Sequence, residues 1–215
     1  MFRKIFNFLL VTLGLSSLNA KAQDVKVFGE QDVKPNITKH ITNYSNQLGA
    51  EVGFPLTKNV TGSFTTRLGV TYSKEHRKIS NNSMNFVGAS YKLGKGSLGL
   101  NGSWNIIRQP NGTVFNELGV FAPYSIRFKL FGKSCSNVIF PWYIKPLNSN
   151  KNVFTLSDRF NVILDKQWTA YVQGFATKTV INGSAPDENS AVIRVGAAYA
   201  LPNNLFKRIK EKANR

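Results

Sequence analysis

The sequence contains little of what stabilises disulfide-rich secreted domains or builds common catalytic sites. It has one cysteine, Cys135, which excludes an internal disulfide. Its two histidines, His40 and His76, lie far apart, and no metal-ligand cluster, phosphate-binding glycine loop or nucleotide motif is present. After residue 22 no run of eighteen apolar residues occurs, so a transmembrane helix is excluded. We therefore expect no metal and no cofactor.

Acidic residues are also scarce. The chain has 28 Lys and Arg residues against 11 Asp and Glu residues, a formal net charge of +17. Such an excess indicates an anionic neighbour, such as lipopolysaccharide, acidic lipid or an anionic solute, although a solvated basic surface would also account for it. Nucleic acid is the poorest of the anionic candidates, because no nucleic-acid-reading motif is found and the N-terminus predicts export.

The N-terminus has the three parts of a secretory signal peptide. Arg3 and Lys4 form the charged start, residues 5–18 the apolar stretch, and Ala20-Lys21-Ala22 a small-residue cleavage site. We predict that residues 1–22 are this signal peptide, whose removal lowers the net charge from +17 to +14 through loss of Arg3, Lys4 and Lys21. Residues 23–43 read as an irregular entry segment, in which Val25, Val27 and Phe28 form at most one short first strand.

From residue 44 to residue 201 apolar and polar residues alternate. The clearest stretch is residues 60–72, where Phe64, Leu68 and Val70 share one face and Thr65, Arg67 and Thr71 the other. A period of two predicts strands with one apolar and one polar face. Similar stretches cover residues 44–56, 85–93, 98–106, 114–130, 137–144, 153–163, 168–180 and 190–201.

Two of these stretches carry irregularities. Residues 114–130 are predicted as one long strand kinked at Pro123. In residues 153–163, Asp158 falls on the apolar face, which a bulge or a different register would explain.

The connections between these stretches alternate in length. Short turns are predicted near residues 57, 95, 133 and 165, and longer polar connections near residues 78, 110, 149 and 185, including residues 73–83. Short turns at one end and long loops at the other are typical of outer-membrane barrels. Nine stretches follow residue 44, and the entry segment would supply a tenth. The fold class predicted is all-β, a closed antiparallel up-and-down transmembrane β-barrel, with ten strands favoured over eight because even counts are the rule.

Alternation alone does not say which face points outward. A soluble lipocalin-like barrel would enclose the apolar face. Here the polar face is rich in Gly, Ser, Thr and Asn, which suits a narrow wet interior. The aromatic residues near strand ends, such as Tyr72, Trp104 and Trp168, suit two girdles at lipid interfaces. Both features favour the membrane arrangement.

The last stretch, residues 190–201, carries a more specific pattern. Arg194-x-Gly196-x-x-Tyr199-x-Leu201 resembles the assembly signal on the closing strand of bacterial outer-membrane barrels. Over residues 44–201 the chain resembles the small outer-membrane β-barrel superfamily, which includes porin-like and OmpA-like barrels. That resemblance implies location in the cell outer membrane, lipid and lipopolysaccharide as neighbours, and the barrel-assembly machinery as a partner during insertion.

The chain departs from that pattern after residue 201, where the closing strand would normally end. Residues 202–215 form a basic tail that we expect on the periplasmic side. It would either contact a protein partner or acidic polymer or act only as a frayed solubilising end. Its basic residues are Lys207, Arg208, Lys210, Lys212 and Arg215.

The polar face, if it lines the lumen, carries charges that must be paired. They are Glu51, Arg67, Glu117, Arg127, Lys129, Arg159 and Arg194. We expect Arg194 to meet Glu51 across the seam. Salt bridges that fill the lumen would make the barrel a structural or interaction component, including a subunit of a larger outer-membrane complex. A surplus of positive charge along a water path would instead make a narrow anion-favouring channel. The filled interior usual for small barrels favours the first reading.

A third function, a lipid A-modifying enzyme, would use Ser73, Glu75 and His76 in a predicted outer loop. We expect no enzyme, because neighbours on one loop rarely converge into a catalytic triad. The basic residues Lys74, Arg77 and Lys78 of the same loop are candidates to contact lipopolysaccharide phosphates, although a generic solvated loop is the plainer explanation and is preferred.

Overall fold

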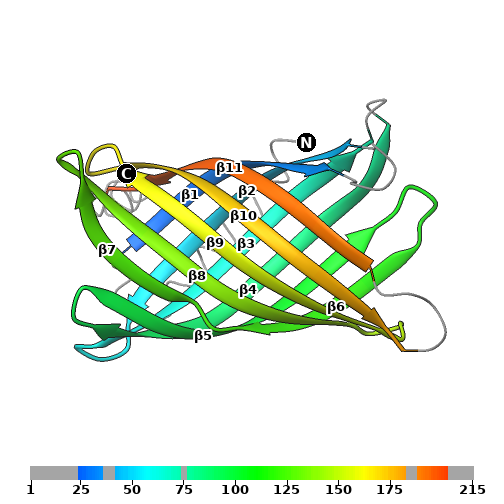
Figure 1. The fold of residues 1–215 in the computed structure, drawn as a ribbon, viewed down its shortest axis with the longest axis horizontal. Coiled ribbons are helices and arrows are strands. Elements are labelled where there is room, and N and C mark those ends of the chain that lie inside the picture. The colour runs from blue at the N-terminus through cyan, green and yellow to red at the C-terminus, as the bar shows by residue number, and fades with distance from the viewer. Residues whose placement is uncertain (1–23, 36–41, 74–76, 183–187, 203–215) are drawn as a thin grey trace, which may run out of the picture.

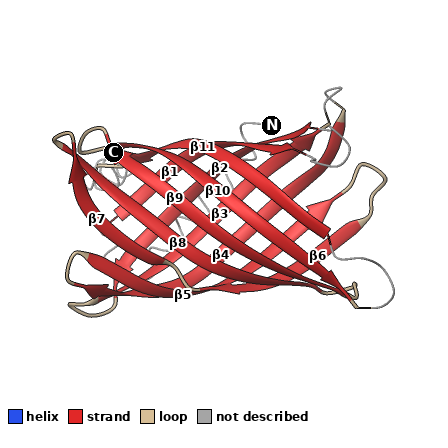
Figure 2. Ribbon diagram, viewed as in Figure 1, coloured by secondary structure: helices blue, strands red, loops and turns tan. Residues whose placement is uncertain are grey.

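The computed structural model describes residues 24–35, 42–73, 77–182 and 188–202, and these residues form strands joined by turns and loops, without helices (Figures 1 and 2). No helix able to cross a membrane is found among them. The strands are β1 (Asp24–Pro35), β2 (Thr42–Pro55), β3 (Val60–Tyr72), β4 (Lys78–Leu93), β5 (Gly96–Arg108), β6 (Val114–Phe121), β7 (Tyr124–Leu130), β8 (Lys133–Pro146), β9 (Lys151–Ile163), β10 (Trp168–Ile181) and β11 (Glu188–Ala200).

The sheet closes on itself. Successive strands pair antiparallel, and β1 pairs with β11 from Lys26 opposite Ala200 to Val33 opposite Ile193. Strands β6 and β7 both pair with β5 and β8, and the register runs on across the break at Ala122 and Pro123. A proline has no N–H for the ladder, which accounts for the interruption. They are thus two halves of one strand, and the prediction of a closed ten-strand antiparallel barrel is confirmed.

Several strand limits differ from the predictions. β1 is a full strand of 12 residues rather than a short one. β4 begins at Lys78, inside the predicted loop of residues 73–83, and β8 begins at Lys133, where a turn was predicted. The start of β4 has polar residues on both faces, such as Asn81 and Asn82, so no period-two pattern marks it. Pairing with β3, where Ser80 lies opposite Thr71, holds it in the sheet.

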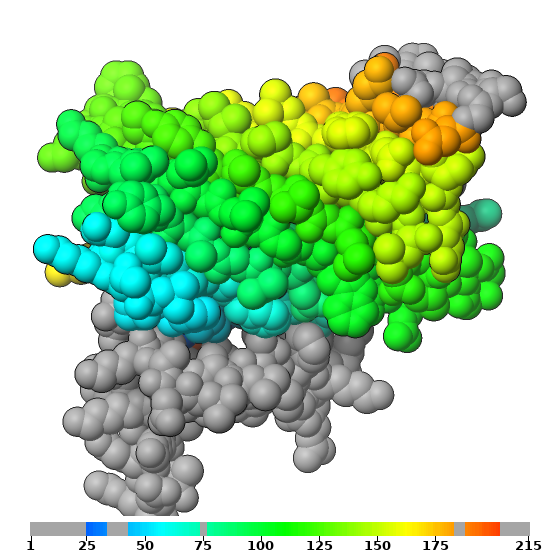
Figure 3. Space-filling view, turned by 90° about the horizontal axis from the view of Figure 1, so that it is seen from below, coloured from blue at the N-terminus to red at the C-terminus, as the bar shows by residue number. Residues whose placement is uncertain are grey.

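The barrel is apolar outside and polar inside. Many large outward side chains are exposed, among them Leu48, Val87, Leu100, Val120, Phe154, Leu156, Val172 and Ile193. The inward positions of the same strands hold buried polar side chains, among them Glu30, Gln47, Thr65, Ser103, Ser157, Gln173 and Arg194. Such a surface would associate or aggregate in water but suits hydrocarbon. Figure 3 shows part of this wall as a continuous surface over the cyan, green and yellow strands.

The two ends of the barrel differ in their connections. One end, the turn end, has the four short turns at residues 56–59, 94–95, 131–132 and 164–167. The N-terminal end of β1 and the C-terminal end of β11 lie at this end too. The other end, the loop end, has the connections at residues 36–41, 73–77, 109–113, 147–150 and 182–187. In bacterial outer-membrane barrels the short turns, the start of the first strand and the end of the last strand lie on the periplasmic side. The chain has this architecture, and the cell outer membrane is its location.

Candidate functional site in the lumen

Two carboxylates project into the lumen from β1. Glu30 and Asp32 are two residues apart, and the period of two puts both on the inner face. Only 5% of Glu30 and 2% of Asp32 is exposed. β1 lies between β2 and β11, so both carboxylates are within reach of side chains from either neighbour. Buried carboxylates of this kind require partners.

Glu30 is the centre of the contacts. Arg67 Nη1 on β3 lies 3.1 Å and Arg194 Nη1 on β11 lies 3.3 Å from Glu30 Oε2. The Tyr171 hydroxyl on β10 donates to Glu30 Oε1. One carboxylate on β1 therefore connects to three other strands across the inside of the barrel.

Asp32 completes the arrangement. Arg194 donates from Nε and Nη2 to Asp32 Oδ1 and Oδ2, at 2.6 Å and 3.0 Å. Gln47 Nε2 on β2 donates to Oδ2 at 2.8 Å. A two-point contact between a guanidinium and a carboxylate fixes both groups in orientation as well as in charge. We call Glu30, Asp32, Arg67, Tyr171 and Arg194 the lumen cluster.

Aromatic rings flank the cluster arginines. The Arg67 guanidinium lies 5.0 Å from the ring centre of Phe28 and 5.2 Å from that of Phe86. The Arg194 guanidinium lies 4.8 Å from the ring centre of Phe175. Rings at this distance attract cations and keep water away from them. The cluster is therefore held by packing as well as by charge.

Arg159 on β9 lies beside the cluster without joining its ion pairs. Its guanidinium stands 5.3 Å from the Tyr171 ring centre. Its Nε is buried and has no hydrogen-bond partner. Around the cluster, three guanidinium groups thus face two carboxylates, and Arg159 is the surplus cation.

A cavity of about 1630 Å³ leads to the cluster from the turn end. Its walls include Lys26, Asp165 and Lys166 near the turns, and Arg67 and Arg194 at its inner limit. None of the described loop-end residues lines it. We call this cavity the vestibule, and it ends at the lumen cluster.

Beyond the cluster, towards the loop end, polar side chains on the inner face form hydrogen bonds with one another. Ser45 is fully buried and accepts a hydrogen bond from Thr71 at 3.3 Å. At the height of the cluster, where Gln173 lies opposite Arg194, Gln173 Nε2 donates to Ser157 at 2.7 Å. Asn105 Nδ2 donates to Glu117 at 3.2 Å. The loop half of the lumen therefore carries hydrogen-bonded polar side chains, whereas the charged residues that line the vestibule are mainly cations.

The vestibule is strongly basic. Apart from Glu51 and Asp165, its charged lining residues are all cations: Lys26, Arg67, Lys92, Lys95, Arg127, Lys129, Arg159, Lys166 and Arg194. Of the predicted lumen charges, Arg67, Arg127, Lys129, Arg159, Arg194 and Glu51 line this cavity, whereas Glu117 lies on the loop side of the cluster.

The expected pairing of Arg194 with Glu51 is wrong. Arg194 meets Asp32 and Glu30, and Glu51 instead lies 3.6 Å from Lys26 near the turn end. Glu30 and Asp32, which bind two of the arginines, were absent from the predicted site because β1 was read as irregular. The predicted polar face held two acids and five bases. This shortage of acids was the available signal that a strand carrying further acids, here β1, also faces the lumen.

The closing strand positions its signal residues on two faces. Arg194 and Gly196 face the lumen, and an ideal Cβ on Gly196 would lie only 2.5 Å from Tyr171 Cζ. Tyr199 lies on the outer face, 4.9 Å between ring centres from Trp168, and Leu201 follows on the same face. The glycine thus makes room for the ring whose hydroxyl holds Glu30.

The remaining predicted residues lie at the ends of the chain or of the barrel. Arg77 and Lys78 are exposed at the loop end, and the Arg77 N–H donates to the Ser73 hydroxyl at 3.3 Å. Lys74, Glu75 and His76 fall outside the described residues, as do His40 and the tail residues Lys207, Arg208, Lys210, Lys212 and Arg215. Within the described part of the chain, no group of three metal-ligating residues is found.

Comparison with known proteins gives similarity in structure alone. No protein-family model and no curated protein matches the sequence. An outer-membrane channel from Pseudomonas putida F1 is 8% identical with a TM-score of 0.46, covering 86% of this chain and 97% of that one. The KdgM porin is 11% identical with a TM-score of 0.45, covering 82% and 99%.

An anion-selective porin from Comamonas acidovorans is 11% identical, with a TM-score of 0.42. The match covers 80% of this chain but only 58% of the porin, so the chain spans little more than half of that protein.

Proposed function

We propose that this protein is a barrel with a closed lumen that acts as a structural or interaction component of the outer membrane, within a larger complex. The observation that carries the proposal is the lumen cluster. Through Glu30 it joins β1 to β3, β10 and β11 across the inside of the barrel. A solute moving along the axis would have to separate these charges.

Energetics support a closed state. Removing one partner of a buried ion pair costs about 3–5 kcal/mol, because the other charge is left uncompensated. Here Glu30 is shared by two guanidinium groups and a hydroxyl, and Asp32 is held by a two-point contact. Opening a path would disrupt several such contacts together. Thermal motion alone would therefore rarely open the lumen.

Recordings in planar lipid bilayers test the closed lumen. We expect the purified full-length barrel to insert without producing steady openings. Gel mobility of heated and unheated portions of the same sample checks that the inserted protein is folded. Steady openings from the folded native protein would refute the proposal.

The vestibule favours a second candidate, a narrow anion path. Nine basic side chains line it, and Arg159 at its inner end has a buried Nε without a partner. Positive walls concentrate anions and repel cations. In the same recordings this candidate predicts steady openings with a reversal potential on the anion side in a salt gradient. Cation-selective openings would contradict both candidates.

We propose a role without catalysis. The acids of the lumen cluster are occupied by ion pairs with Arg67 and Arg194, and among the described residues no serine–histidine–acid arrangement surrounds them. The remaining enzymatic hypothesis depends on His76. His76→Ala is expected to leave the lipid A profile of the producing cells unchanged, as mass spectrometry would show, and an altered profile would revive it.

A further inference from the structure

The outer wall carries one charged residue that its neighbours do not explain. Asp158 on β9 is exposed and points outward, between Phe154, Leu156, Phe160 and Val162 at the alternate positions. Its register partners are Ile139 on β8 and Gly174 on β10, and no register shift occurs there. The bulge or different register that would have turned it inward is absent from this part of the sheet.

Asp158 lies near mid-height of the membrane-spanning wall. It is the eighth of the 13 residues of β9, and Ile139 and Gly174 are each the seventh of 14 residues in β8 and β10. Among the described strands, the outward-facing basic residues Arg108, Lys145 and Lys178 lie near the loop end and Lys133 lies near the turn end, so none is at mid-height. An isolated carboxylate at this depth is costly in hydrocarbon.

There is open space beside this carboxylate. A Cβ built on Gly174 meets nothing within 4 Å, and the following outward neighbour in the row is Ile193 on β11. This row therefore holds one carboxylate with open space beside it over Gly174. The apolar side chains of Ile139 and Ile193 lie at its two ends.

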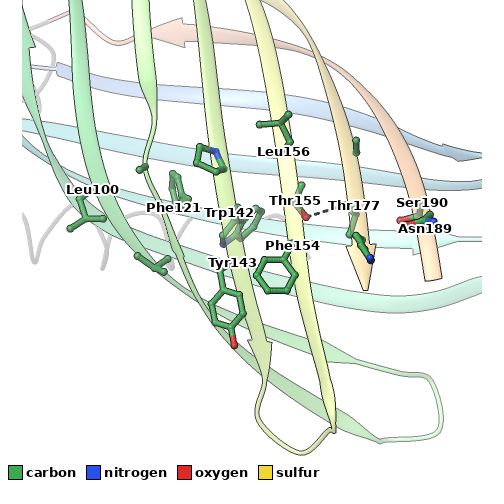
Figure 4. Close-up of a pocket in the computed structure, with 15 residues that line it drawn as sticks. Leu100, Phe121, Trp142, Tyr143, Phe154, Thr155, Leu156, Thr177, Asn189 and Ser190 are labelled. Carbon is green, nitrogen blue, oxygen red and sulfur yellow. Dashed lines mark hydrogen bonds between the residues drawn. The ribbon is translucent and has the colours of Figure 1, made fainter. Parts of the chain in front are cut away.

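A groove of about 810 Å³, whose lining residues are drawn in Figure 4, lies on the loop side of this row. Pro141, Leu156 and Ala176, which are paired across β8, β9 and β10, form part of its lining, each two residues from a member of the Asp158 row. Its other outward lining includes Leu100, Val120 and Phe154. The β6–β7 interruption at Ala122 lies in the same wall, where the Ala122 N–H reaches Pro141 O at 3.3 Å. Here the ladder lacks the donors of Pro123 and Pro141.

We propose that this part of the wall, around Asp158 and the groove, binds a transmembrane segment of a partner protein that presents a lysine or arginine side chain to Asp158. The inference rests on the proposed role as an interaction component and assigns that role a surface and a partner chemistry. The groove would hold the apolar side chains of the segment. The space over Gly174 would admit the basic side chain.

Charge decides between the occupants. Lipid acyl chains offer no hydrogen-bond donor at mid-height, so lipid alone leaves Asp158 unpaired. In a two-fold dimer formed through this surface, Asp158 would face its own copy, because such an interface is self-complementary. The outward basic residues of the described strands lie at another height, so a second copy would not supply the counterion either. A different protein with a basic residue satisfies the carboxylate.

Site-specific photo-crosslinking in the outer membrane of producing cells tests this surface. A photoreactive phenylalanine analogue replaces Val172, an outward residue two positions from Gly174, or, as a matched control, Val87 on β4; both valines are exposed. We expect Val172 alone to give one discrete adduct with another protein. Asp158→Leu should reduce its yield at least tenfold, and the cross-linked segment should contain a lysine or arginine. Changing that residue to Asp together with Asp158→Lys should restore the adduct.

Other outcomes overturn the inference. They are an adduct with lipid only, an adduct of twice the mass of this chain, equal adducts at Val172 and Val87, no adduct, or an adduct unaffected by Asp158→Leu. Heat-modifiable mobility must show that each variant is folded, and Asp158→Asn, with the smaller change, replaces Asp158→Leu if the latter does not fold. The cross-linking result does not depend on conductance. The inferred partner surface can therefore fail this test while the lumen proves closed, and it can pass while the lumen proves open.

Discussion

Glu30 in the lumen and Asp158 on the outer wall are both carboxylates near the middle of a strand, yet their surroundings are opposite. Glu30 is shared by Arg67, Arg194 and the Tyr171 hydroxyl. Asp158 lies between Ile139 and Gly174 with no ion pair among the described residues. Folding thus satisfies the inner charge within the chain, whereas the outer charge has no ion pair within the part of the chain that the structure describes. The difference suggests that the inner carboxylate acts in the barrel itself and the outer one in an assembly.

The largest expected effect comes from breaking the inner arrangement. Glu30→Ala leaves Arg67 and Arg194 without a shared counterion, and we expect it to lower the free energy of unfolding by about 3–5 kcal/mol. Urea titration of the barrel in phospholipid vesicles would measure this. Glu51→Ala, which removes a half-exposed pair with Lys26, is the control and should cost at most about 1 kcal/mol. Equal losses for the two variants would contradict the account of the cluster.

A smaller loss is expected when the inner arrangement is only displaced. Gly196→Ala places a Cβ 2.5 Å from Tyr171 Cζ, so the ring must move and its hydroxyl loses Glu30. Overpacking of this kind costs about 1–3 kcal/mol. The same titration should show that Gly174→Ala, where the Cβ meets nothing within 4 Å, costs far less. A loss at Gly196 that is no larger than at Gly174 would show that the close approach to Tyr171 is unimportant.

Replacing the outer carboxylate, Asp158, should change the free energy of unfolding in the opposite direction. In synthetic phospholipid vesicles, where no partner protein is present, Asp158→Leu removes a charge from hydrocarbon and should stabilise the barrel by up to about 2 kcal/mol. Glu188→Leu, at the loop-end start of β11, is the control and should change stability little. A marked loss of stability in Asp158→Leu would mean that Asp158 has a structural role within the chain.

A third carboxylate, Asp165, lies in a water-exposed turn and should show the smallest effect. The backbone N–H groups of Gln167 and Trp168 donate to its Oδ1, both at 2.7 Å, and they hold the pKa of this carboxyl below its usual range. A lowered pKa in the folded state gives stability that is present above the ordinary value, roughly pH 4, and is lost as the pH falls through the lowered value. Asp165→Asn should therefore flatten the acid dependence of the unfolding midpoint between pH 5 and pH 2, on the order of these pKa values. An unchanged profile would contradict this assignment.

The sequence predicted the barrel because membrane strands follow a local rule. Outward residues must be apolar wherever they meet lipid, so the alternation in residues such as Phe64, Leu68 and Val70 marks β3 without knowledge of its neighbours. The kink at Pro123 followed from the missing N–H, which is also a property of one residue. Features of this kind can be recognised from the sequence alone.

The site depended on relations between distant strands. Asp32 lies 162 residues and Glu30 lies 164 residues before Arg194 in the sequence, and only closure of β1 against β11 brings them together. Gly29 and Gln31 interrupt the outward apolar row of β1, so the strand resembled a loop. Asp158 was placed correctly on the apolar face, but its meaning required the register of β8 and β10.

The most direct test of the central claim, that the lumen cluster closes the barrel, is the conductance of a variant in which one pair is removed as a unit. Asp32→Ala with Arg194→Ala deletes a paired acid and base together, which spares the fold more than deleting either alone. We predict no steady openings for the native barrel and steady, anion-favouring openings for the double variant, because Arg67, Arg159 and the basic vestibule remain. Openings of the same size in native protein and variant would contradict the claim.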